Sequence, residues 1–222
     1  MPAHAHTFDA VVLAGGRGSR LGGADKPALV VGSRTLLASV VSAVTSAGAA
    51  RVVVVGPGRP ALSPGISDPG TGGPGRGARL SYAREEPPGG GPVAALRCGL
   101  AEVSAPAIVL AAADLPFLRP AHITRLLGGV ASPAGPGAVL LDASGRPQWL
   151  VSSWPTALLR GALDRYPGRS LRGLLGPLDP VLLPDETAAG EPPPWLDCDT
   201  PGDLRRARDW AARAGSEQEA TR

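Results

Sequence analysis

Three short runs of the chain are almost entirely apolar: residues 8–14 (FDAVVLA), 51–56 (RVVVVG) and 107–113 (AIVLAAA). Strands that are apolar at successive positions have both faces buried, which is typical of a parallel sheet covered by helices on each side. Residues 35–47 carry apolar side chains at helical spacing and are followed by Gly48, a common helix end. Strand, helix and strand in this order predict an α/β protein, a three-layer α/β/α Rossmann-like sheet that is mostly parallel.

The rest of the chain continues this alternation within one domain, which we place at residues 8–213 of the 222. We expect flexible termini at 1–7 and 214–222. In residues 57–79, twelve of 23 positions are Gly or Pro, so we expect a flexible loop there. The further elements predicted from spacing and turn residues are strands at 80–84, 138–141 and 149–152, and helices from Pro92 to about 103, at 121–127, 156–163 and 171–175, and after Thr200.

Charge and cysteine content exclude several classes of function. The basic residues are 21 arginines and a single lysine, the net charge is +3, and no four basic residues are consecutive, so we expect no nucleic-acid partner. The two cysteines have no metal-ligand spacing. The N-terminus lacks the pattern of a signal peptide, and the uncharged segment 35–50 is too short and polar to span a membrane. The sequence therefore predicts a cytoplasmic protein with no membrane association.

The segment 13–27 (LAGGRGSRLGGADKP) is the most informative stretch, because a glycine-rich loop directly follows a predicted buried strand. Glycines let the backbone approach a ligand closely. The only cations of the segment are Arg17, Arg20 and Lys26, at the carboxyl end of a strand, where open α/β sheets bind ligands. Backbone amides together with three cations suit a polyphosphate.

Two common phosphate-binding loops do not fit this segment. A P-loop needs Gly-Lys-Ser/Thr, whereas Lys26 stands between Asp25 and Pro27. A dinucleotide fingerprint needs G-x-G-x-x-G, whereas Leu21 occupies the third glycine position after Gly16 and Gly18. The loop therefore predicts a different kind of nucleotide site.

Carboxylates follow other predicted strands. Asp114 comes directly after the run 107–113, so its side chain lies at the same sheet edge as the glycine loop and suits Mg²⁺, which binds one or two protein carboxylates plus phosphate oxygens. In the extended piece WLDCD, we expect Asp197 and Asp199 on opposite faces, with one of them toward the site. Glu85 follows a strand end and either contacts a ribose or base or lies exposed on the surface.

The segment LAGGRGSRLGGADKP resembles the signature of the nucleotidyltransferase family with a Rossmann-like sheet that includes molybdenum cofactor guanylyltransferase. The resemblance continues in the order of the chain through GGGPVAALRCGL (89–100), AADLPFL (112–118) and DTPGDL (199–204). It implies a Mg²⁺-dependent enzyme that transfers a nucleoside monophosphate from a nucleoside triphosphate to a phosphorylated acceptor and releases pyrophosphate.

The resemblance also implies roles for individual residues. Lys26 and Arg17 would neutralise phosphate oxygens, and Asp114 would hold Mg²⁺, with Asp199 either a second metal ligand or a stabiliser of the following helix. Glu85 would contact the nucleoside. The nucleobase would be bound by the backbone of Leu13, Ala14, Gly15 and Gly16.

Within this family LAGG accompanies guanine and LAAG cytosine, so the resemblance implies GTP as the donor, molybdopterin as the acceptor and molybdoenzyme maturation proteins as partners. Three alternatives stay open. The acceptor is another phosphorylated compound such as a sugar phosphate, because GRPQWL (145–150) stands where the guanylyltransferases have His-Pro. In the second alternative, the donor is CTP instead of GTP. In the third, the chain is a catalytically silent nucleotide-binding protein.

Overall fold

The structure is a computed structural model of the chain, and it describes residues 7–15, 21–57, 78–130, 135–184, 186–188 and 190–220. Nearly all of the terminus and loop for which we predict flexibility, residues 1–6 and 58–77, lies outside this set. Gly16, Arg17 and Arg20 of the glycine-rich loop also lie outside it.

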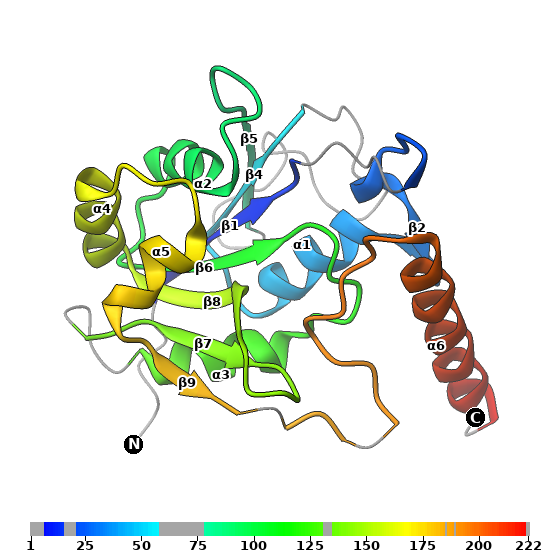
Figure 1. Ribbon diagram of the computed structural model, residues 1–222. Coiled ribbons are helices and arrows are strands. Elements are labelled where there is room, and N and C mark those ends of the chain that lie inside the picture. The colour runs from blue at the N-terminus through cyan, green and yellow to red at the C-terminus, as the bar shows by residue number, and fades with distance from the viewer. Residues whose placement is uncertain are drawn as a thin grey trace.

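A seven-stranded sheet runs through the centre of the domain in the order β5-β4-β1-β6-β8-β7-β9 (Figure 1). Strand β8 is antiparallel to both of its neighbours, β6 and β7, and the other neighbouring pairs are parallel. The prediction of a mostly parallel sheet is therefore confirmed. The strands are β1 (Phe8–Leu13), β4 (Arg51–Val55), β5 (Arg79–Ala83), β6 (Ala107–Ala112), β7 (Ala138–Leu141), β8 (Pro147–Pro155) and β9 (Val181–Leu183).

Helices cover both faces of the sheet, which confirms the three-layer architecture (Figure 1). One face packs against α1 (Leu36–Ser46) and α3 (Pro120–Gly129), and the other against α2 (Pro92–Ala101), α4 (Thr156–Arg165) and α5 (Leu171–Leu175). The last helix, α6 (Pro201–Ala220), packs on a small hairpin of β2 (Val30–Val31) and β3 (Arg34–Thr35).

Strand β1 shows why its residues are apolar at successive positions. Phe8, Ala10 and Val12 belong to the core on the α1 and α3 side, whereas Val11 and Leu13 belong to the core on the α2 side. Successive side chains of a strand point to opposite faces, so a strand with helices above and below it is apolar on both faces, and in β1 only Asp9 departs from this.

Three details differ from the sequence-based expectations. Helix α6 runs to Ala220, past the domain end that we place at 213. Strand β9 and the β2–β3 hairpin are not predicted, because segments of two or three residues are too short to show a period. Strand β8 is nine residues long, where the sequence predicts four. Its first four residues, which include Gln148, precede the pairing with β6 and extend toward the carboxyl edge of that strand.

Asp9 is a buried carboxylate within β1, and its Oδ2 accepts hydrogen bonds from the backbone N–H groups of Ser104 (2.8 Å) and Ala105 (2.9 Å). We expect Asp9→Ala to lower the free energy of unfolding by about 2–4 kcal/mol, because two N–H groups lose a charged acceptor. Urea denaturation measures this. Asp164→Ala is the control, since that side chain is 79% exposed. A loss below about 1 kcal/mol for Asp9→Ala would contradict the structural role.

Candidate active site

The backbone that begins the glycine-rich loop is tied to both neighbouring strands. Ala14 donates its N–H to the carbonyl of Val55 on β4 (2.7 Å), and Leu13 accepts a hydrogen bond from the N–H of Ala113 beyond β6 (3.0 Å). A Cβ at Gly56 would lie 2.9 Å from the Ala14 carbonyl oxygen, so this close approach requires glycine. The Ala14 N–H is already used within the sheet, and the exposed Gly15 lies just beyond it.

Lys26, the only lysine of the chain, begins the short 3₁₀ helix Lys26–Ala28 and pairs with two carboxylates. Its Nζ forms an ion pair with Asp114 and donates a hydrogen bond to Asp199, 173 residues away in the sequence. The structure thus brings together three of the residues that we predict for the site: Lys26, Asp114 and Asp199.

The electrostatics of this cluster favour the charged lysine. Burial by itself lowers the pKa of Lys26, but attraction to Asp114 and then to Asp199 outweighs it, so the pKa lies above its usual value of 10.5. The ammonium is therefore charged at neutral pH. It pairs with two carboxylates, those of Asp114 and Asp199, and not with a single one.

Asp114 follows the end of β6, and its side chain is only 16% exposed. Oδ2 pairs with Lys26, whereas the buried Oδ1 accepts no hydrogen bond from the described residues. A buried carboxylate oxygen in this position is a suitable ligand for a hard cation such as Mg²⁺. The described residues contain no group of three His, Cys, Asp or Glu side chains placed to hold a metal. A Mg²⁺ ion here would therefore need substrate phosphate oxygens as additional ligands, as Mg²⁺ commonly does.

The segment before α6 corrects one expectation. Asp197 and Asp199 both line the same cavity, so they do not point to opposite faces. The expectation was wrong because side chains two residues apart in an extended segment point to the same face, whereas the residue between them, the buried Cys198, points to the other. The N-terminus of α6 is capped by Thr200 and Asp203, each of which accepts the other's backbone N–H. Asp199 itself pairs with Lys26.

The cavity beside Asp114 has a volume of about 240 Å³. Asp197 is exposed overall, yet partial burial of its carboxyl raises its pKa, and the negative charges of Asp199 and Asp114 raise it further. Burial and the neighbouring carboxylates thus both oppose ionisation of Asp197. The lining residues are Ala112, Asp114, Leu115, Gln148, Leu150, Val151, Trp195, Asp197 and Asp199.

Glu85 lies apart from this cluster. It follows β5, which is three strands away from β6, so about 14 Å of sheet separates the two strands at the usual spacing. Its Oε1 accepts the N–H of Gly89 (2.7 Å), and its Oε2 is buried without a hydrogen bond from the described residues. Glu85 is thus neither fully exposed nor part of the Lys26 cluster.

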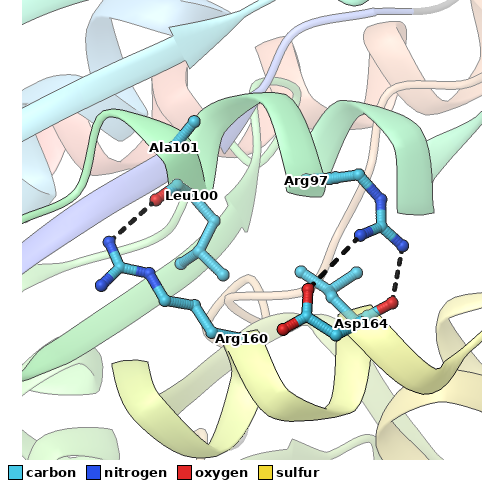
Figure 2. Close-up of a pocket in the computed structure, with 6 residues that line it drawn as sticks. Arg97, Leu100, Ala101, Arg160 and Asp164 are labelled. Carbon is cyan, nitrogen blue, oxygen red and sulfur yellow. Dashed lines mark hydrogen bonds and ion pairs between the residues drawn. The ribbon is translucent and has the colours of Figure 1, made fainter.

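A second cavity of about 240 Å³ lies between α2 and α4 (Figure 2). Its two arginines serve the fold: Arg160 donates to the carbonyls of Leu100 (3.3 Å) and Val103 (2.8 Å) at the end of α2, and Arg97 donates to that of Leu163 near the end of α4 (2.6 Å). Helix ends leave carbonyls unpaired, and these arginines satisfy them. We therefore assign this cavity no part in the site.

Cys198 lies between the two acidic residues and is fully buried. Burial raises its pKa to about 12, and the charge of Asp114 contributes to the shift. At pH 8 only about one molecule in ten thousand carries the thiolate, so we expect no alkylation of Cys198 by iodoacetamide in the native protein. Peptide mass spectrometry with and without urea measures this. Rapid native alkylation of Cys198 would show that the segment opens readily.

The fold and the arrangement of Lys26, Asp114 and Asp199 define the class as a nucleotidyltransferase fold with an acidic site at the carboxyl edge of its central strands. Residues 10–181 match the model of the MobA-like NTP transferase domain. The chain belongs to that family.

The chain is also similar to individual proteins. It is 35% identical over 156 residues to the bifunctional protein GlmU of Sorangium cellulosum (strain So ce56), which covers 62% of this chain and 32% of that protein, so the chain spans about a third of the length of this relative. A nucleotidyl transferase from Methanothermobacter thermautotroptrophicus superimposes with a TM-score of 0.71 at 24% identity, covering 94% of this chain and 99% of that one.

Two further solved structures share the fold. Molybdopterin-guanine dinucleotide biosynthesis protein A from Archaeoglobus fulgidus has a TM-score of 0.67 at 20% identity, covering 92% and 99% of the two chains. Rv0371c from Mycobacterium tuberculosis, solved as a complex with manganese, has a TM-score of 0.63 at 23% identity, covering 91% and 98%. Related proteins of this fold therefore bind a divalent metal. In the described part of the chain, no helix is both long and apolar enough to cross a membrane.

Proposed function

We propose that this protein transfers a nucleoside monophosphate from a nucleoside triphosphate, GTP, to a phosphorylated acceptor, molybdopterin, and releases pyrophosphate. The observation that carries the proposal is the meeting of Lys26, Asp114 and Asp199 where β1 and β6 end, directly beside the glycine-rich loop. The family match and the likeness to a molybdopterin-guanine dinucleotide biosynthesis protein support it.

The charges of the site favour a metal-dependent reaction. One positive charge, on Lys26, faces the carboxylates of Asp114, Asp197 and Asp199, so the cavity by itself repels a triphosphate. A divalent cation held by Asp114 and Asp199 offsets this repulsion, and when bound it neutralises phosphate charge as the reaction proceeds. Both carboxylates pair with the Lys26 ammonium, so Lys26 is already placed to exchange a carboxylate for a phosphate oxygen.

The remaining residues position the substrates. The backbone of Leu13, Ala14, Gly15 and Gly16 binds the nucleobase. The groups that follow the last hydrogen bonds of the sheet, and so face the nucleobase, are the Ala14 carbonyl and the Gly15 amide. Glu85, at the end of β5, contacts the nucleoside. Arg17 and Lys26 neutralise the phosphates. An acceptor phosphate oxygen forms a bond to the α-phosphorus while the bond from that phosphorus to pyrophosphate breaks, and no covalent intermediate with the protein is needed.

Pyrophosphate release tests this function. Purified protein is incubated with Mg²⁺, molybdopterin and each of the four ribonucleoside triphosphates in turn. We expect release with GTP and only when the acceptor is present. Release with CTP in place of GTP would overturn the donor assignment, release only with a different phosphate ester would overturn the acceptor, and binding of GTP without release under any combination would indicate a silent nucleotide-binding protein.

A further inference from the structure

The cavity beside Asp114 lies on the side of β6 away from the residues assigned to the nucleotide. The glycine-rich loop and Glu85 follow β1 and β5, which lie on one side of β6, whereas Gln148, Leu150 and Val151 of the cavity come from β8 on the other side. A nucleotide bound over β1 and β5 with its phosphates at Asp114 leaves this cavity for the second substrate.

Gln148 occupies a defined position in this cavity. Strands β6 and β8 pair Ala107 with Pro155 and Ala111 with Val151. The start of β8 therefore lies beyond this pairing, toward the carboxyl end of β6, and Gln148 lines the same cavity as Asp114.

The amide of Gln148 is oriented by its neighbours. Its Nε2 donates to Oδ2 of Asp142 (2.9 Å) and to the carbonyl of Arg146 (3.4 Å), and because both partners only accept hydrogen bonds, the nitrogen must occupy that side. Asp142 is fixed in turn, since its Oδ1 accepts from Ser144 N (2.8 Å), Ser144 Oγ (2.6 Å) and Arg146 N (3.0 Å). The group that Gln148 has left for a ligand is therefore its carbonyl oxygen, an acceptor.

The polar lining of the cavity consequently consists of acceptors: the carboxylates of Asp114, Asp197 and Asp199 and the amide oxygen of Gln148. Lys26 pairs with Asp114 and Asp199 but is not itself among the described lining residues, so Asp197 adds a negative charge beyond those two pairs. Such a surface binds N–H and O–H donors, and it disfavours a ligand that brings a second anionic group.

We propose that this cavity receives the body of the acceptor and selects phosphate monoesters whose body carries hydroxyl, amino or ammonium donors over those with a second anionic group, with Gln148 and Asp197 as specificity-determining residues. This inference rests on the proposed function only in taking the second substrate to be a phosphate ester.

Three phosphate esters of similar size test the selection: phosphoethanolamine, glycerol 3-phosphate and 3-phosphoglycerate, which differ in carrying an ammonium, hydroxyls or a carboxylate. Their binding is measured by calorimetry to the full chain with Mg²⁺ and a GTP analogue that has a methylene group between the α- and β-phosphorus. We expect the first two to bind at least about tenfold more tightly than 3-phosphoglycerate, because only the last brings a second anionic group, its carboxylate, against Asp197. Equal affinity for all three, or no binding of any, would overturn the inference.

Two variants make the test specific. Asp197→Lys is expected to reverse the ranking and favour 3-phosphoglycerate, whereas Asp209→Lys, at an exposed position of α6, adds the same charge change and leaves the ranking as in the wild type. Gln148→Leu is expected to weaken glycerol 3-phosphate about tenfold without altering affinity for the GTP analogue. An unchanged ranking in Asp197→Lys contradicts the assignment of this cavity.

Pyrophosphate release measured with the same proteins separates the two proposals. If the ranking of esters is found but no combination of substrates releases pyrophosphate, the selective cavity stands and the proposed function fails. If molybdopterin and GTP release pyrophosphate while the esters show no ranking, the function stands and this inference fails.

Discussion

Replacing Lys26 by alanine is expected to lower turnover by about 10²- to 10³-fold, by analogy with the loss of one preorganised donor at a developing charge. Lys26 is the only lysine of the chain, and it already pairs with Asp114 and Asp199, where the phosphates of a bound nucleotide would lie. The measurement is pyrophosphate release at saturating nucleotide. Arg34→Ala, which removes an exposed guanidinium that bonds Ser42, is the control and should leave turnover unchanged.

The same substitution is also expected to raise the affinity of the site for a divalent cation, although it lowers turnover. Without the ammonium, Asp114 and Asp199 lose the positive charge that they share, so a divalent cation no longer competes with Lys26 for their oxygens. We expect Lys26→Ala to bind Mn²⁺ about tenfold more tightly than the wild type without nucleotide, as measured by electron paramagnetic resonance. A variant that keeps more than half of wild-type turnover, or that binds Mn²⁺ no better, would contradict the assigned role of Lys26.

Replacing Asp114 by asparagine is expected to raise the Mg²⁺ concentration for half-maximal turnover by at least about tenfold, because a neutral amide oxygen is a poorer ligand for a hard cation than a carboxylate. The effect on nucleotide affinity should be smaller, because Asp114 acts through the metal. A Mg²⁺ titration of turnover and a separate nucleotide titration measure the two effects. Overlapping Mg²⁺ curves for the variant and the wild type would place the metal elsewhere.

Asp199→Asn is the informative comparison for Asp114→Asn. Both carboxylates pair with Lys26, but the side chain of Asp199 is 45% exposed and that of Asp114 only 16%. If Asp199 is a second metal ligand, its substitution shifts the Mg²⁺ titration as strongly as that of Asp114. If Asp199 only orients Lys26, the Mg²⁺ titration stays close to that of the wild type and the nucleotide titration shifts instead.

The sequence determined the layers of the fold because the relevant signals are local. Residues 8–14 must be buried on both faces since they are apolar at successive positions, and β1 does contribute side chains to both cores. The start of α6 was equally predictable, because Thr200 and Asp203 stand at the spacing in which a side chain caps a helix. The glycine-rich loop, Lys26 and Asp114 could be found in the same way, as residues that directly follow predicted buried strands.

Only the tertiary structure decided which of these groups meet and which way they face. We expected Asp197 and Asp199 on opposite faces, yet both line one cavity, as alternation requires of side chains two residues apart. That their shared face is the one toward Asp114 depends on how the segment packs against the rest of the domain. The contact of Lys26 with Asp199 joins residues 173 positions apart, and no periodicity extends over such a separation. The presence of Gln148 in the cavity of Asp114 likewise depends on β8 being antiparallel to β6, a pairing that the sequence pattern of either strand does not specify.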